Sequence, residues 1–256
     1  MSFLSRFVTD MFGGGPKYGA LQQFTVAKEN KVAKIPDHTS FAEASVLPTC
    51  FNTALVALCG EAGIGFSLPG PSLNPKQLGK TILVWGASSS VGLETLQVAR
   101  AAGITTIATA SPHNFEVVKS AGASQVFDYH NPFVADSLVR AIRSVEGHFV
   151  GVFDCISDEE RSLSHCISVL KDVGGGKLAT VKPDKKLELP GNIELCRVFA
   201  FNDLVDPFWR DFLTPALDNG TLKCLPQPRV VGEGLGWVQE ALDTLEKGLL
   251  AEVGGS

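Results

Sequence analysis

The stretch TILVWGASSSVG, residues 81–92, decides the fold of this chain. Its first five residues form a short, continuous apolar run, which is typical of a strand buried on both faces. Residues 91–102 predict a helix that ends at Gly103. The serine-rich turn that joins the two, Gly86 to Gly92, lies where a nucleotide-binding fold has its phosphate loop.

Segments of strand and helix character continue to alternate after this unit. The sequence pattern predicts strands at residues 104–108, 125–127, 149–153, 177–181 and 195–201, and helices at 114–120, 134–145 and 159–170. Strands that alternate with helices of this length indicate βαβ units. We therefore expect an α/β fold with a doubly wound parallel sheet of the Rossmann type.

The segments that flank this sheet have a different character. Residues 21–27 are a candidate strand, 41–59 an apolar helical stretch interrupted by Pro48, and 60–79 a surface loop rich in glycine and proline. Residues 204–217 and 237–245 have helical character. No internal repeat is visible along the chain.

Composition excludes several classes of protein. With 256 residues, 45% of them apolar and only 19% charged, the chain has ample material for a core and is not intrinsically disordered. A net charge of -5 argues against a face for nucleic acid or for an anionic membrane.

The cysteines and the first residues of the chain indicate the compartment. The six cysteines are scattered, without a C-x-x-C pair or a usual metal-ligand spacing to histidine, as expected of reduced thiols without a metal. Residues 1–12 contain no stretch long enough for a signal or a membrane span. We expect a cytoplasmic protein with no metal and no membrane association.

The turn after the first strand retains part of the dinucleotide fingerprint G-x-G-x-x-G. Its three glycine positions fall on Ala87, Ser89 and Gly92, so only the last is kept. Small side chains still let a pyrophosphate approach the backbone, serine hydroxyls add donors, and Gly92 allows close contact between helix and strand. The predicted phosphate-binding residues are Ser88, Ser89, Ser90, Val91 and Gly92. The alternative is a strand–helix turn that binds another ligand.

The end of the second strand favours NADPH over NADH. An NAD-dependent enzyme usually has Asp or Glu about 20 residues after the glycines, to accept the ribose hydroxyls. Here that position is Ser111, and no carboxylate occurs before Glu116. Donors suited to a 2′-phosphate lie in the segment Ser111, Pro112, His113 and Asn114. Alternatively, Ser111 only caps the following helix.

Two further strand ends complete the predicted cofactor site. Tyr129 follows the third strand and is placed to lie against the adenosine, unless it is an ordinary half-exposed aromatic. Cys155 and Ile156 follow the fourth strand and should approach the nicotinamide, unless they only pack. No nucleophile and base can be paired by spacing, so the catalytic residues stay unknown; a hydride-transfer enzyme tolerates this because its cofactor carries the chemistry.

The chain resembles the medium-chain dehydrogenase/reductase superfamily over residues 15–250. Within it, the chain is most similar to the zinc-independent fungal trans-acting enoyl reductases that serve polyketide synthases, of the lovastatin and toxin-cluster type. The resemblance is carried by GALQQF (19–24), AKIPD (33–37), VWGASSSVG (84–92), TASPHN (109–114), VFDY (126–129) and FDCIS (153–157).

This resemblance implies an activity in secondary metabolism. It implies reduction of an α,β-unsaturated thioester on an acyl carrier with NADPH, with hydride added to the β-carbon and a proton to the α-carbon. A polyketide synthase would be the partner. The residues implied to line the substrate channel are Thr49, Phe51, Asn52, Thr53, Arg197, Val198, Phe199, Ala200 and Phe201.

The resemblance also implies a division into domains. Residues 1–48 would be a remnant of the family's GroES-like β-barrel, 49–220 the NADP-binding domain, and 221–256 a segment that returns toward the barrel. Other readings stay open: a quinone or alkenal reductase, an alcohol dehydrogenase, for which no four-cysteine zinc lobe is present, or a non-catalytic NADPH-binding remnant. The sequence does not determine the oligomeric state.

Overall fold

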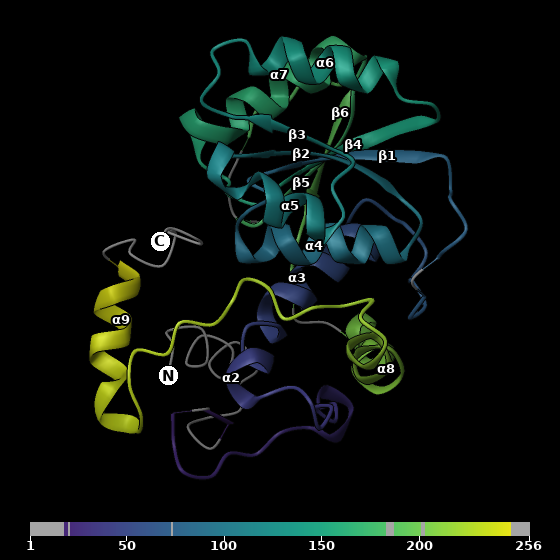
Figure 1. Ribbon diagram of the computed structural model, residues 1–256. Coiled ribbons are helices and arrows are strands. Elements are labelled where there is room, and N and C mark those ends of the chain that lie inside the picture. Colours follow the sequence, from purple (N-terminus) through teal and green to yellow (C-terminus); the bar gives the residue numbers. More distant parts are fainter. Residues whose placement is uncertain (1–17, 20, 73, 183–186, 201–202, 247–256) are drawn as a thin grey trace.

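A six-stranded parallel β-sheet forms the centre of the computed structural model, which describes residues 18–19, 21–72, 74–182, 187–200 and 203–246 (Figure 1). Its strands are β1 (Lys80–Trp85), β2 (Thr105–Ala110), β3 (Gln125–Asp128), β4 (His148–Asp154), β5 (Gly176–Thr180) and β6 (Ile193–Arg197). The strand order is β3-β2-β1-β4-β5-β6, and every neighbouring pair is parallel. This is the order of a dinucleotide-binding fold, so the predicted α/β class is confirmed.

Helices cover both faces of the sheet. On one face lie α3 (Pro48–Cys59), α4 (Ser90–Ala101) and α5 (Phe115–Ala121), and on the other α6 (Val134–Ser144) and α7 (Ser164–Val173) (Figure 1). The side chains of β1 alternate between these layers, because successive residues of a strand point to opposite faces. Ile82 and Val84 pack in the core with α3 and α4, whereas Leu83 and Trp85 pack with α6 and α7.

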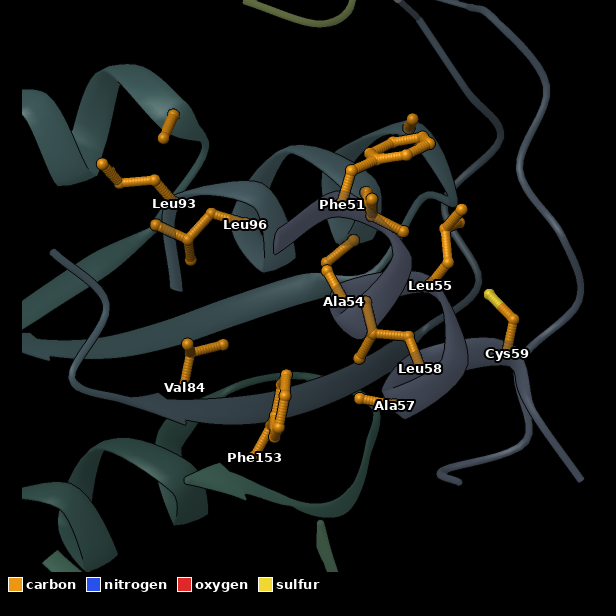
Figure 2. Close-up of a cluster of buried hydrophobic side chains, with 14 of the residues drawn as sticks. Phe51, Ala54, Leu55, Ala57, Leu58, Cys59, Val84, Leu93, Leu96 and Phe153 are labelled. Atoms are coloured by element: carbon orange, nitrogen blue, oxygen red, sulfur yellow. The ribbon is translucent and has the colours of Figure 1, made fainter. Parts of the chain in front are cut away.

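Helix α3 is the apolar helix at the centre of the larger core. It begins at Pro48, because the first turn of a helix tolerates a residue without an amide hydrogen. The same proline cannot continue the preceding helix α2 (Phe41–Ala44). Phe51, Leu55 and Leu58 of α3 are fully buried in one cluster with residues of α4 and of the sheet, among them Leu96 and Phe153 (Figure 2). By length and composition alone, the stretch Phe41–Cys59 is apolar enough to cross a membrane, a test that a core helix also passes.

One expectation on the flanking segments is wrong. No β-strand precedes β1 in the described part of the chain, so residues 21–27 are not a strand and a remnant of a GroES-like barrel is not seen. A strand needs a neighbour for its amides and carbonyls, and none of the described segments supplies one. Phe24 in this stretch is 88% exposed.

Residues 204–217 are helical throughout, as predicted, but the helix is irregular. They form a 3-10 turn (Asp203–Val205), a π-helical turn (Phe208–Phe212) and the short helix α8 (Leu213–Asp218). Prolines at 207 and 215 lack the amide that a regular α-helix would need. The last helix, α9 (Val238–Glu246), agrees with the prediction, and β6 ends four residues earlier than expected.

Candidate cofactor-binding site

The predicted site residues gather at the carboxyl edge of the sheet. The strand order reverses between β1 and β4, because the chain adds β2 and β3 on one side and β5 and β6 on the other. Parallel sheets bind ligands in the crevice outside the carboxyl ends of their strands at such a switch point. Four stretches with predicted roles start there, after β1, β2, β3 and β4.

The loop after β1 is fixed by the neighbouring strand. The Gly86 amide donates to Thr109 Oγ1 at 3.0 Å, and the Ala87 amide donates to the Thr109 carbonyl at 2.9 Å. Gly86 has a φ of +72°, a conformation that side chains disfavour, so it makes the sharp turn out of the strand. Gly86 has no predicted role, although a glycine directly after a buried strand is a usable signal. Ala87, which falls on a fingerprint position, has a buried side chain.

The first turn of α4 offers free amides toward the crevice. Ser89 is the N-cap and its hydroxyl accepts from the Gly92 amide at 3.1 Å. The amides of Ser90 and Val91 precede the first intrahelical hydrogen bond and so have no acceptor within the helix. Residues 88–91 are half-buried, whereas those before them are buried. This arrangement suits an anion such as a pyrophosphate.

Gly92 permits the close approach of α4 to β1. A Cβ atom at this position would lie 2.6 Å from both Ala87 Cα and the Gly86 carbonyl oxygen. These are backbone atoms that cannot rotate away. The predicted need for glycine at residue 92 therefore has a direct steric basis.

Replacing Ser89 with alanine should cost about 1 kcal/mol of unfolding free energy, because the Gly92 amide loses its cap. Urea denaturation measures this. Ser120→Ala is the matched control, because its exposed hydroxyl only bonds a carbonyl of its own helix and its loss should stay within about 0.5 kcal/mol. Equal losses in the two variants would show that the cap contributes nothing.

Ser111 and Tyr129, predicted from different strands, meet in the structure. Ser111 Oγ and the Tyr129 hydroxyl are 3.0 Å apart. Ser111 makes no side-chain cap bond to the 3-10 turn Pro112–Asn114 that it precedes, so its hydroxyl is not acting as the helix cap. His113 is exposed, and Asn114 is buried with its Oδ1 lacking a hydrogen-bond partner.

Tyr129 is 37% exposed at the same edge, and the centroid of its ring lies 4.1 Å from the centroid of the His130 ring. His130 donates its amide to the Asp128 carboxylate at 3.0 Å, and this hydrogen bond lowers the pKa of Asp128. Asp128, at the end of β3, is a carboxylate without a predicted role. Hydrogen bonds from His130 already occupy one of its oxygens.

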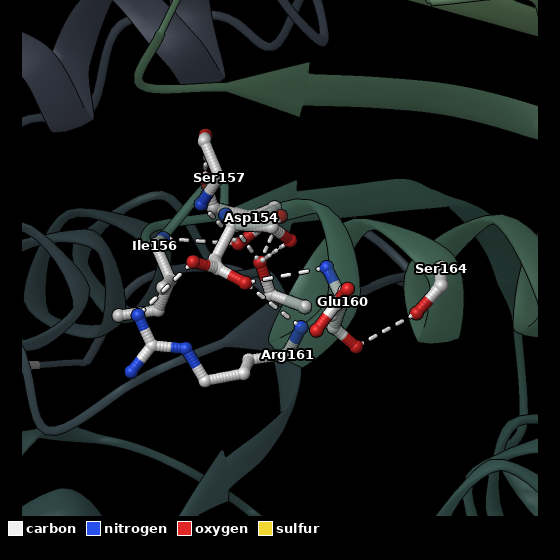
Figure 3. A network of polar contacts seen from close by, with 8 residues as sticks. Asp154, Ile156, Ser157, Glu160, Arg161 and Ser164 are labelled. Atoms are coloured by element: carbon white, nitrogen blue, oxygen red, sulfur yellow. Dashed lines mark hydrogen bonds and ion pairs between the residues drawn. The ribbon is translucent and has the colours of Figure 1, made fainter.

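The turn after β4 contains a network of polar contacts, which Figure 3 shows around Asp154. Cys155 has a buried side chain, and burial raises the pKa of its thiol, so it is an unreactive core residue. Ile156 is partly exposed and lies over the start of the phosphate loop, as the contact of its Cγ1 with the Cβ position of Gly86 shows.

The first predicted substrate stretch lies at the start of α3, beside the phosphate loop. The Cys50 thiol interacts with Ser90, and burial raises the pKa of this thiol to about 11. Phe51 is fully buried and stacks on Phe212 at 5.9 Å, so its ring belongs to the core rather than to a channel. Asn52 accepts from the Trp209 indole at 3.0 Å.

Thr49 and Thr53 complete this stretch and are half-buried one turn apart. The Thr53 hydroxyl donates to the Thr49 carbonyl at 2.7 Å. Of the four predicted residues, Phe51 packs in the core, Asn52 bonds Trp209 and Thr53 bonds its own helix. Among the contacts of the described residues, the side chain of Thr49 alone has none of these roles.

The second predicted substrate stretch leaves β6 at the same edge of the sheet. Arg197 ends β6 and is exposed, Val198 is buried, and Phe199 is exposed. Ala200 is half-buried, and Phe201 lies outside the described residues. Substrate binding by both stretches stays a prediction.

A buried carboxyl lies behind the phosphate loop, on α4. Glu94 is fully buried; its Oε2 accepts from Gln97 Nε2 at 3.3 Å, and its Oε1 has no hydrogen-bond partner. Burial raises the pKa of Glu94 well above its ordinary value. The sequence pattern gave no signal for this group, because helix surfaces also carry glutamates.

Glu94→Gln should stabilise the protein at pH 7–8. A raised pKa in the folded state means that folding favours the protonated form, so the wild type loses stability as pH rises above 4.5, the ordinary glutamate value. The neutral variant avoids this loss, which is about 1–3 kcal/mol. The difference in Tm between Glu94→Gln and the wild type should therefore shrink as the pH falls toward 4.5. Glu116→Gln, on the exposed face of α5, is the control and should show no such trend.

Comparisons with known proteins agree with this geometry. No protein-family model matches the chain. It is 41% identical over 249 residues to the dehydrogenase orsE of Emericella nidulans, covering 93% of this chain and 71% of that protein. It is 37% identical to the trans-enoyl reductase himH of Aspergillus japonicus, covering 98% and 70%, and 33% identical to the trans-enoyl reductase tndF of Aspergillus flavipes, covering 93% and 69%.

Solved structures share the fold. The JamJ enoyl reductase has a TM-score of 0.63 at 19% identity, over 89% of this chain and 65% of that one. A mycobacterial protein solved in complex with NADPH has a TM-score of 0.62 at 22% identity, over 90% and 68%. An NAD-dependent alcohol dehydrogenase has a TM-score of 0.65 at 23% identity, over 93% and 64%.

Proposed function

Because this chain belongs to the fungal trans-enoyl reductases and dehydrogenases of the medium-chain dehydrogenase/reductase superfamily, we propose that it reduces an enoyl thioester with NADPH. The observation that carries the proposal is the loop of residues 86–92 at the switch point of the sheet. The amides of Ser90 and Val91 have no acceptor within the helix, and a side chain at Gly92 would collide with the backbone of the turn. This loop fits a pyrophosphate.

The residues that would hold the cofactor follow from their places at this edge. Residues 88–91 would bind the pyrophosphate, and residues 111–114 the 2′-phosphate. Tyr129 would lie along the adenosine and Ile156 along the nicotinamide half. When bound, NADPH supplies the hydride that reduces the β-carbon of the substrate.

The choice of NADPH rests on the Ser111–Tyr129 pair. Two hydroxyls lie at the end of β2 where an NAD-specific site has a carboxylate, and a hydroxyl can donate to a 2′-phosphate without repelling it. His130 holds one oxygen of the neighbouring Asp128 carboxylate through two hydrogen bonds. The hydroxyl pair supports a site that accepts the additional phosphate.

The substrate class rests on the relatives, several of which are trans-enoyl reductases. We place the acyl chain near Thr49, at the start of α3, and Phe199, which follows β6, and we propose that a polyketide synthase delivers it on a carrier.

Stopped-flow absorbance tests the function with the full chain, NADPH and a crotonyl thioester. We expect substrate-dependent loss of NADPH absorbance, with NADH consumed more slowly at equal concentration. A quinone replaces the thioester in a parallel experiment. Consumption with the quinone alone would make the protein a quinone reductase. Tight NADPH binding without turnover of either substrate would make it a non-catalytic coenzyme-binding protein.

A further inference from the structure

Asp154 is a buried carboxylate at the carboxyl end of β4, fully shielded from solvent. Its Oδ1 accepts from the amides of Ile156 and Ser157, both at 2.9 Å, and its Oδ2 accepts from Ser162 Oγ at 2.7 Å (Figure 3). Three short hydrogen bonds to one buried side chain fix the whole turn that follows the strand.

The turn that Asp154 holds is conformationally unusual. Ser157 has a φ of +55° and is the one residue other than glycine with a positive φ in the described part of the chain. This conformation is disfavoured for a side-chain-bearing residue and persists only where its surroundings impose it. Besides Asp154, the turn is tied to the next strand, because the Val181 amide donates to Ser157 Oγ at 3.0 Å.

The result of this geometry is the position of Ile156. A Cβ atom at Gly86 would lie 2.4 Å from Ile156 Cγ1 and 2.7 Å from its Cδ1, so the isoleucine side chain occupies the space over the first residue of the phosphate loop. Its remaining surface is partly exposed at the β1–β4 switch point. An apolar side chain therefore spans the two halves of the crevice.

We infer that Asp154 is a positioning residue for the coenzyme, which acts by holding Ile156 across the β1–β4 switch point as an apolar wall for the nicotinamide half. The inference rests on the proposed function, because it presumes that a nicotinamide coenzyme occupies this crevice. Asp154 itself is buried.

The charge on Asp154 is not what the turn requires. Two backbone amides need an acceptor, and the Ser162 hydroxyl, which the Asp158 amide also contacts at 2.9 Å, can accept from a side-chain amide. Asp154→Asn preserves both contacts, whereas Asp154→Ala removes them. The inference therefore predicts rescue by asparagine.

A double-mutant cycle read by NADPH fluorescence tests this route of action. Asp154→Ala and Ile156→Ala should each weaken NADPH binding about 10-fold, and the double variant should also be weakened about 10-fold, because both act through one contact. Asp154→Asn should stay within about 3-fold of the wild type. Ser162→Ala, a milder change, should shift affinity in the same direction if Asp154→Ala fails to fold.

A matched control separates positioning from stability. Leu138→Ala empties part of the core under α6, on the opposite face of the sheet, and should lower the Tm at least as much as Asp154→Ala without weakening NADPH binding. If Asp154→Ala or Ser162→Ala lowers the Tm but leaves the NADPH Kd unchanged, or if the double variant loses about 100-fold, the inference is overturned while the proposed function stands. A wild-type chain that binds neither NADPH nor NADH overturns both.

Discussion

Gly92→Val will abolish tight coenzyme binding. The new Cβ would meet Ala87 Cα and the Gly86 carbonyl oxygen at 2.6 Å, so the start of α4 must move away from β1. That movement withdraws the amides of Ser90 and Val91 from the phosphate position. Hydrogen bonds to a charged group contribute about 1.5–3 kcal/mol each, so the loss of both predicts a decrease in NADPH affinity of about 100-fold or more.

The same substitution should lower the free energy of unfolding by about 1–3 kcal/mol through overpacking. Gly191→Ala is the control, because a Cβ at Gly191 meets no atom within 4 Å. Calorimetric titration with NADPH and thermal unfolding of both variants measure the two effects. Normal NADPH affinity in Gly92→Val would show that the coenzyme does not lie on this loop.

Ser111→Asp should reverse the coenzyme preference. A carboxylate beside a bound 2′-phosphate repels it by about 4 kcal/mol at contact distance near a protein surface, which corresponds to a loss of roughly 1,000-fold in NADPH affinity. NADH carries no phosphate there, and its ribose hydroxyls can donate to the new carboxylate, so its affinity should be retained.

Side-by-side titrations with NADPH and NADH measure this reversal, and Ser111→Ala is the matched control. The alanine variant removes only the hydroxyl next to Tyr129, so its NADPH affinity should fall by about 10-fold or less. If the aspartate variant binds both coenzymes equally poorly, the 2′-phosphate does not lie at the end of β2.

The parts of the fold that sequence reasoning predicted are those specified by local pattern. The run Ile82 to Trp85 reads as a buried strand because its side chains enter cores on both faces of the sheet, and this is what the structure has. Residues 21–27 have comparable strand character but no neighbouring strand, so they stay irregular. Pairing partners are distant in sequence and leave no trace in the segment itself.

The site shows the same division. Their places after neighbouring strands predicted Ser111 and Tyr129 at one edge of the sheet, and the structure adds that their hydroxyls are in contact. The role of Asp154 was not predictable, because at the end of an apolar run an aspartate resembles any strand-terminating polar residue. Its importance arises from Ser157 and Ser162, which a turn brings back toward it.

The pairing of β1 with β4 has a consequence for the energetics of the whole chain. The two strands are separated in sequence by β2, β3 and their helices, so the crevice between them exists only after the two βαβ halves have joined. A ligand held there binds the assembled state and neither half alone. By thermodynamic linkage, tighter binding of the ligand therefore stabilises the joined state of the two halves.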